Sequence, residues 1–143
     1  MASTSGTIEI LQPADKVMAV IADIRRYPEW VSGMSDIDIE DGADSLPAFV
    51  TSSISAGPIK DRVKLGYEWS SHAVSWKLVQ ASALKTMSGN YTVEPVTNGS
   101  KVTYTVEIEL VAPLPRFLMS TAEKTIITTA LNGLKKFCES GAR

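Results

Sequence analysis

The sequence is poor in the residues that build disulfides and metal centres. Its 143 residues include one cysteine, Cys138, and one histidine, His72. A single cysteine excludes a disulfide within the chain and is typical of a reducing compartment, so we expect a cytoplasmic protein. One histidine far in sequence from one cysteine, with no carboxylates at ligand spacing, gives no zinc signature, and we expect no metal site.

Several longer signals are also missing. The chain has no glycine-rich phosphate loop, no nucleophile elbow and no nucleotide motif, so we expect no cofactor. No apolar run approaches the roughly 20 residues of a membrane-spanning helix, and residues 1–12 lack the basic and apolar regions of a secretory signal. The net charge is −2 without a block of Lys and Arg, which argues against a nucleic-acid partner.

What is present is a globular composition with two kinds of periodicity. A hydrophobic content of 44% and a charged content of 21% predict one folded domain over residues 1–143. Apolar residues recur at helical spacing after Pro13 and again through 115–140. Between about 35 and 111 they alternate with polar residues, which is typical of antiparallel strands with one buried face.

These patterns predict a definite order of elements. A strand at 4–11 precedes a helix that begins at Pro13, and a short second helical turn follows at 27–31. Six strands come next, around 37–39, 48–55, 59–69, 72–80, 83–94 and 101–111. The helix over 115–140 closes the chain, and we expect Gly133 to lie where this helix crosses the sheet closely.

Three tight turns predict how the strands align. The turns fall at 70–71, 81–82 and 98–99, where Asn98 and Gly99 both tolerate positive φ. Each alignment places apolar residues opposite apolar residues, as one buried face requires. The predicted pairs include Tyr67 with Val74, His72 with Tyr91, and Tyr91 with Val106.

Five stretches of the sequence are similar to those of a known superfamily. They are "PADKVMAVIADIRRYPEWVSG" at 13–33, "VSWKLV" at 74–79, "LKTMSGNYTVEP" at 84–95, "GSKVTYTVEIEL" at 99–110 and "PLPRFLMSTAEKTIITTALNGLKKFCE" at 113–139. They resemble the START-like superfamily, also called the helix-grip or birch-pollen-allergen fold. Within it, the resemblance is to the polyketide cyclase/dehydrase and lipid-transport group, which includes coenzyme Q-binding proteins. It implies an α+β fold, β-α-α-β6-α, whose curved antiparallel sheet wraps around the long C-terminal helix.

The resemblance also implies a cavity between the sheet and that helix. Tyr27 and Trp30 would then lie where the short helices meet the sheet and close one end. Mostly apolar walls with a few hydroxyls suit a lipid, an isoprenoid quinone or a polyketide-like molecule. The candidate ligand-binding residues are Trp30, Val50, Ser52, Ile54, Leu65, Tyr67, Trp76, Met87, Tyr91, Tyr104, Val106, Met119 and Ile127.

Three functions stay open at this point. The first is a non-catalytic carrier of a small hydrophobic molecule. The second is a polyketide aromatase or cyclase that uses His72 and Tyr91 as acid and base. Asp61 is excluded as a partner of His72 because about 3.3 Å per residue puts it roughly 26 Å away along the strand. The third is a protein-interaction module, and a homodimer is a further expectation.

Overall fold

The computed structural model of the protein describes residues 4–31, 33–42, 46–56 and 59–140. Every element that the sequence predicts is present, although the second helical turn begins at Ile24 instead of Tyr27 and is a 3-10 helix. The elements are β1 (Thr4–Ile10), α1 (Ala14–Ala22), η1 (Ile24–Glu29), β2 (Met34–Asp41), β3 (Pro47–Ala56), β4 (Ile59–Trp69), β5 (Ala73–Gln80), β6 (Leu84–Val96), β7 (Gly99–Leu110) and α2 (Arg116–Glu139).

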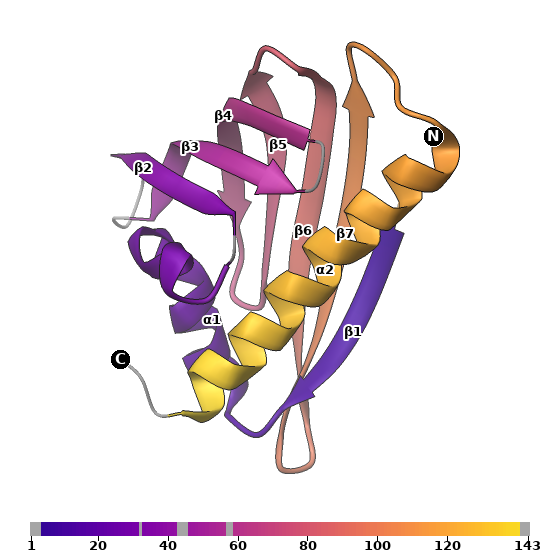
Figure 1. Ribbon diagram of the computed structural model, residues 1–143. Coiled ribbons are helices and arrows are strands. Elements are labelled where there is room, and N and C mark those ends of the chain that lie inside the picture. The colour runs from indigo at the N-terminus through magenta and orange to yellow at the C-terminus, as the bar shows by residue number, and fades with distance from the viewer. Residues whose placement is uncertain (1–3, 32, 43–45, 57–58, 141–143) are drawn as a thin grey trace.

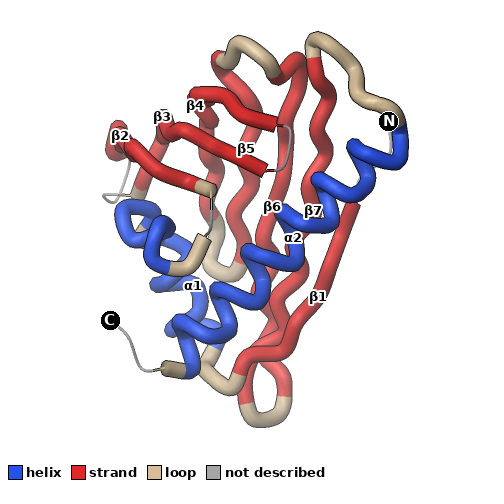
Figure 2. Tube along the Cα trace, viewed as in Figure 1, coloured by secondary structure: helices blue, strands red, loops and turns tan. Residues whose placement is uncertain are grey.

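The strands form one antiparallel sheet that curves around α2. Their order is β1-β7-β6-β5-β4-β3-β2, so β1 pairs with β7, and β2 to β7 pair with one another in chain order. Figure 1 shows α2 running diagonally across the concave face, over β1 and β7. In Figure 2, α1 and η1 lie together beside the C-terminal half of α2 and cover one end of the sheet.

The predicted cross-strand pairs are wrong by two residues in each hairpin. Tyr67 faces Trp76, and Tyr91 faces Val74 on one side and Tyr104 on the other. The last turn shows the cause. Thr97 and Asn98 form it, Asn98 adopts a φ of 76°, and Gly99 already belongs to β7. A shift of two residues leaves every side chain on its predicted face, so the inward and outward assignments hold.

Gly99 is a glycine because of packing between strands, not because of the turn. A Cβ at this position would lie 2.1 Å from the carbonyl oxygen of Ile10, at the end of β1. The sequence signal "NG" was therefore correctly assigned to a hairpin, but its glycine serves the contact with the neighbouring strand.

Gly133 also allows a close approach, but its neighbour is not the one we expected. A Cβ there would lie 1.9 Å from the carbonyl oxygen of Trp30, just after η1. The crossing of α2 over the sheet is instead permitted by Gly6 on β1, where a Cβ would meet Ile127 Cγ2 at 2.6 Å. The two glycines thus fix α2 against different partners.

The end of the sheet beneath α1 is solidly packed. α1 packs against β6, β7 and α2, and burial of each of its apolar side chains contributes about 1.5–3 kcal/mol. The side chains no more than 1% exposed at this end include Ile10, Val17, Ile21, Ile24, Val93, Val102 and Leu134. Cys138 is also buried here, and burial raises the pKa of its thiol to about 11.

Candidate functional site

The opposite end of the same sheet encloses a cavity of about 390 Å³. Its walls come from the concave faces of β3–β7, from the segment that joins η1 to β2, and from one side of α2. Gly33, Ser55 and Thr125 are exposed and line its mouth. The other lining residues are Tyr27, Val31, Met34, Ser52, Ile54, Ala56, Ile59, Leu65, Tyr67, Trp76, Met87, Tyr91, Tyr104, Ile108, Ile126, Thr129 and Ala130.

Most candidates selected from strand alternation do line this cavity. They are Ser52, Ile54, Leu65, Tyr67, Trp76, Met87, Tyr91 and Tyr104. These residues were predicted correctly because a register shift of two residues leaves each side chain on the same face of its strand. Whether they bind a ligand stays a prediction.

The other five candidates do not line the cavity. Val50 and Val106 are 1% and 0% exposed and pack within the sheet's core. Ile127 lies over Gly6 of β1, Met119 packs half-buried near the start of α2, and Trp30 lies behind Tyr27. Alternation identifies the inward face of a strand, but it does not tell where along that face the space is left unfilled.

A cluster of aromatic rings forms the inner wall. The indole of Trp76 lies at its centre, with ring centroids 5.8 Å from Tyr67, 5.5 Å from Tyr91 and 5.8 Å from Tyr104. The last two stack on each other at 4.5 Å. The indole lies directly over Gly89, where a Cβ would come within 2.6 Å of its Cζ2. Gly89 on β6 therefore makes room for Trp76, a role that the sequence signals did not identify.

Tyr27 in η1 and Trp30 directly after it have different structural roles. Their rings pack with centroids 4.7 Å apart, and the Tyr27 hydroxyl donates a hydrogen bond to the carbonyl of Ile21. Only Tyr27 lines the cavity, and its burial raises the pKa of its phenol. Trp30 instead seals the junction between η1 and α2 at Gly133.

Two buried polar atoms of the wall lack hydrogen-bond partners. Within the described ranges, neither Ser52 Oγ nor Trp76 Nε1 meets a protein donor or acceptor, although Ser52 is 1% and Trp76 6% exposed. A buried group left in this state costs about 1–3 kcal/mol unless something else pairs with it. The side chains that carry these atoms line the cavity, but the two atoms themselves have almost no accessible surface.

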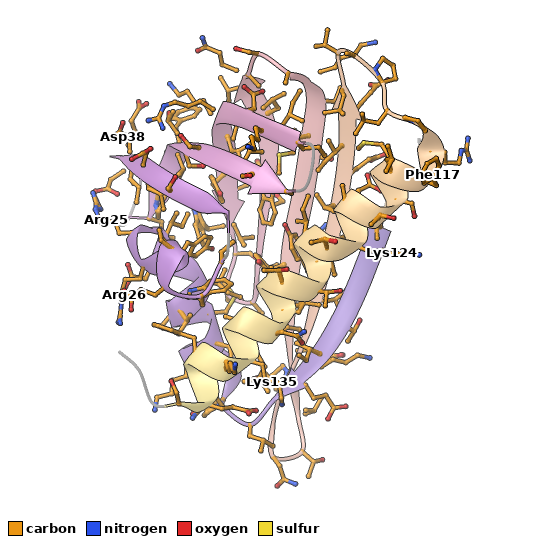
Figure 3. The ribbon with its side chains drawn as sticks, in the orientation of Figure 1. Arg25, Arg26, Asp38, Phe117, Lys124 and Lys135 are labelled. Carbon is orange, nitrogen blue, oxygen red and sulfur yellow. The ribbon has the colours of Figure 1, made fainter. Side chains whose placement is uncertain are left out.

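The cavity wall carries no charge. Among its lining residues, all of them in the described part of the chain, none is Asp, Glu, Lys, Arg or His. Charged side chains such as Arg25, Asp38 and Lys124 lie on the outer surface (Figure 3). The same described residues contain no group of three or more His, Cys, Asp and Glu that could hold a metal ion.

His72 and Tyr91 do not come together. His72 lies in the β4–β5 turn, its side chain is 45% exposed, and its Nε2 is 3.8 Å from Asp15 Oδ1. It borders a separate surface hollow that includes Pro13 and Asn98. Ser70 N–H donates a hydrogen bond to the carbonyl of Ala73, so His72 lies in the loop between β4 and β5. The expected pairing of His72 with Tyr91 was therefore wrong.

Asp61 holds a turn and does not line the cavity. Its Oδ2 accepts N–H groups of the β5–β6 connection, from Ala83 (2.7 Å), Ser82 (3.0 Å) and Leu84 (3.1 Å). Burial opposes ionisation of this carboxyl, but these N–H groups and that of Arg62 outweigh it, so the pKa of Asp61 falls below its usual range. The carboxylate thus stabilises the hairpin beside the cavity.

The arrangement defines the class of domain. A curved antiparallel sheet that holds a long C-terminal helix over an apolar cavity is the helix-grip, or START-like, α+β fold, as the sequence predicted. No helix in the described residues combines the length and hydropathy needed to cross a membrane.

Comparison of the whole chain then places it in a family. The family model described as polyketide cyclase / dehydrase and lipid transport matches residues 1–139, and the chain belongs to this family. No curated protein matched the sequence.

Solved structures with the same fold are distant in sequence. A START superfamily protein from Mycobacterium smegmatis has a TM-score of 0.88 at 13% identity, covering 96% of this chain and 97% of that one. The Zhui aromatase/cyclase from a Streptomyces species has a TM-score of 0.83 at 13% identity, with 99% of both chains covered. The di-domain ARO/CYC BexL has a TM-score of 0.76 at 17% identity, covering 99% of this chain and 50% of BexL.

Proposed function

We propose that this protein binds a small hydrophobic molecule between the sheet and α2 and carries it without altering it. The observation that supports this most is an uncharged, mainly apolar cavity of about 390 Å³ with an exposed mouth. Burial of apolar surface at about 25 cal/mol per Å² supplies affinity without a charge pair. The family also includes lipid transport in its description.

The size of the cavity limits what can be enclosed. A volume of about 390 Å³ equals that of about thirteen liquid waters, so the enclosed part has on the order of 13 to 20 non-hydrogen atoms. A molecule with two or three fused rings fits this volume. A long isoprenoid or acyl tail has to extend through the mouth.

Two neighbouring threonines of α2 provide a matched test. Thr129 lines the cavity, whereas Thr128 is exposed and does not. Thr129→Trp should fill the space and weaken binding of the neutral probe N-phenyl-1-naphthylamine by at least about tenfold, a loss of about 1.4 kcal/mol. Thr128→Trp should bind it like the wild type, and thermal unfolding checks that both variants fold.

Two outcomes of these measurements would disprove the proposal. If the wild type does not bind the probe, and protein from its native host carries no molecule in native mass spectrometry, carriage of a small hydrophobic molecule is excluded. If Thr129→Trp and Thr128→Trp bind the probe equally well, binding does not take place in this cavity.

A second candidate function is aromatase or cyclase activity on a poly-β-keto chain. The family description and the names of two structural neighbours favour it. Such a cavity can act by folding the chain and excluding water, with one group as acid. Tyr91 is the acid we assign, because it lines the cavity and His72 does not. Burial raises the pKa of Tyr91, so its hydroxyl donates hydrogen bonds and is not a base at neutral pH.

The enzymatic candidate predicts a clear difference between two variants. Tyr91→Phe should abolish cyclisation of a poly-β-keto substrate, followed by product chromatography. His72→Ala should leave it unchanged. Equal turnover by Tyr91→Phe and the wild type would exclude Tyr91 as the acid.

The interaction-module alternative would use another surface. Val111, Phe117 and Leu118 flank the connection between β7 and α2 and are 63%, 70% and 37% exposed. Phe117 points away from the body of the protein (Figure 3). Sedimentation of the wild type and of Phe117→Ser tests the expected homodimer through this surface. The cytoplasmic location stays a prediction.

A further inference from the structure

The connection between β7 and α2 exposes a continuous apolar stretch of chain. Residues 110–119 read "LVAPLPRFLM", and Arg116 is the one charged residue among them. None of the ten is buried, and Val111, Phe117 and Leu118 are 63%, 70% and 37% exposed. Single apolar side chains on a surface are ordinary, whereas a contiguous exposed patch marks a surface that meets a partner. We call residues 110–119 the apolar connection.

The backbone of the apolar connection is fixed at both ends. Val111 N–H donates a hydrogen bond of 2.9 Å to the carbonyl of Ala83, and the carbonyl of Pro115 accepts one of 3.0 Å from Leu118 N–H as α2 begins. Between them, Leu114 packs half-buried against the core. The exposed side chains therefore project from an ordered backbone, and little further ordering is needed when a partner binds.

The apolar connection lies beside the mouth of the cavity. It is at the end of the sheet opposite α1 (Figure 1). Leu118 and Thr125 are seven residues apart on α2, about two turns and about 10 Å along the axis, so they share one face of the helix. Thr125 lines the mouth. A partner that covers the apolar connection is therefore next to the opening.

The unpaired charges at this end of α2 are positive. Arg116 and Lys124 are exposed, and neither forms a salt bridge within the described ranges. Lys124 follows Phe117 by seven residues, so both lie on one outward face of α2 (Figure 3). The first turn of α2 contains no acidic residue. The surface thus combines an exposed aromatic ring with two free cations.

The acidic side chains around the apolar connection are engaged within the protein. Glu109, which precedes it, is 4.0 Å from Lys85 Nζ. Glu123 is 7% exposed and accepts a hydrogen bond from the hydroxyl of Thr4. Asp61 accepts N–H groups of the β5–β6 connection. An anionic partner would therefore meet cations and apolar side chains at this surface.

A second copy of the protein fits this surface poorly. Val111, Phe117 and Leu118 together offer roughly 300 Å² of apolar surface, whereas a stable protein interface buries about 800 Å² on each partner. Two copies would also bring the positive charges of Arg116 together, which is unfavourable. A lipid bilayer requires less area, because a few inserted apolar side chains and cations at anionic headgroups are enough for reversible binding.

We infer that the apolar connection docks the protein on an anionic lipid surface. Phe117, Val111 and Leu118 insert at the boundary between headgroups and acyl chains, and Arg116 and Lys124 contact lipid phosphates. Docking in this way brings the mouth of the cavity next to the bilayer. The inference goes beyond the proposed function, because the docking does not require that the cavity hold a ligand.

Sedimentation with lipid vesicles tests the docking. The probes are vesicles of phosphatidylcholine and phosphatidylglycerol in equal parts, and vesicles of phosphatidylcholine alone. We expect the wild type to bind the anionic vesicles at least about tenfold more tightly than the neutral ones. High salt should remove this preference, because it screens exposed charges. These measurements use the unaltered protein, so they do not depend on the folding of a variant.

Two matched pairs of variants locate the contact. Phe117→Ser should weaken binding to anionic vesicles at least about tenfold. Leu11→Ser, which removes a 67% exposed side chain at the other end of the sheet, should not. Arg116→Gln should weaken it about fivefold. Lys101→Gln removes the same charge from the far end of β7 and should leave binding unchanged. Thermal unfolding checks that all four variants fold.

Several outcomes would overturn the docking. The wild type could fail to bind anionic vesicles, or could bind both kinds of vesicle equally well. Equal binding by Phe117→Ser and Leu11→Ser would place the contact elsewhere. A wild-type dimer that Phe117→Ser dissociates would show that a second copy covers this surface.

The docking and the proposed function fail separately. Thr129→Trp fills the cavity and leaves the apolar connection intact, so it should bind anionic vesicles like the wild type. If the wild type binds these vesicles but not N-phenyl-1-naphthylamine, the proposed function fails and the docking stands. If it binds the probe but no vesicles, the docking fails and the proposed function stands.

Discussion

The two ends of this sheet are built from the same strands and the same helix, yet one is solid and the other is hollow. Beneath α1, side chains such as Val17, Ile21 and Leu134 are completely buried against one another. At the other end, α2 presents Thr125, Thr129 and other small side chains toward the Trp76 cluster. The small side chains that α2 presents at this end therefore leave the space unfilled. Among the described residues of α2 that line the cavity, Thr125, Thr129 and Ala130 are small and Ile126 is large.

The largest expected effect comes from opening a void in the solid end. Leu134→Ala removes a fully buried side chain from the contact between α2 and the core below α1. We expect the free energy of unfolding in urea to fall by about 3–5 kcal/mol. Met87→Ala, at the half-buried wall of the cavity, should cost clearly less, because its side chain already borders open space. Equal losses would mean that the two ends do not differ in packing.

Gly133 tests how α2 is fixed next to the cavity. Helix propensity alone predicts that Gly133→Ala stabilises the protein by about 1 kcal/mol. The new Cβ would lie 1.9 Å from the carbonyl oxygen of Trp30, so we expect a net loss of about 1–3 kcal/mol, measured by urea unfolding. A gain in stability would show that η1 moves freely relative to α2.

Asp61 makes the hairpin beside the hollow end sensitive to acid. Its pKa is lowered in the folded protein, so it contributes stability above the unfolded-state pKa, and this contribution is lost as the pH falls through the folded-state pKa. Asp61→Asn should cost about 1–2 kcal/mol at pH 7, because an amide oxygen accepts the three N–H groups less strongly. The gap between wild type and variant should close between about pH 5 and pH 2, measured by thermal unfolding. A gap that stays constant with pH would contradict this role.

The smallest effect compares two buried serines. Ser100 Oγ donates a 2.6 Å hydrogen bond to the carbonyl of Gln12 in the solid end, whereas Ser52 Oγ in the cavity wall has no partner in the described chain. Ser100→Ala should therefore destabilise the protein by about 1–2 kcal/mol. Ser52→Ala in the ligand-free protein should instead stabilise it by about 1 kcal/mol, because the substitution removes a buried hydroxyl that has no partner. A large loss for Ser52→Ala, seen by urea unfolding, would mean that its hydroxyl is paired in the free protein.

Much of the fold could be predicted from the sequence because alternation and helical spacing are local signals. The predicted strand at 59–69 and the closing helix at 115–140 agree closely with β4 and α2. The register could not be predicted to the residue. Asn98-Gly99 and Ser70-Ser71 allow more than one turn, and Gly99 is required by Ile10, a residue far away in the sequence.

From the sequence, the site could be predicted only as the inward-facing side of the strands, without its position along them. Alternation identified Ser52, Trp76 and Tyr91 as inward residues, but it equally selected Val50 and Val106, which fill the core. Thr125 and Thr129 were not predicted, because helical periodicity selects apolar positions and both of these residues are polar. Whether a space remains depends on the sizes of side chains from several elements at once, and no single stretch of sequence contains that information.

Xenon binding tests most directly whether the two ends differ as described. Dry apolar cavities take up xenon, whereas close-packed cores do not. In a crystal of the ligand-free protein under xenon pressure, we expect a xenon atom among Leu65, Trp76 and Ile126, and none in the core beneath α1. A space filled by the side chains of Trp76 and Met87, with no xenon at that end, would contradict the existence of the cavity.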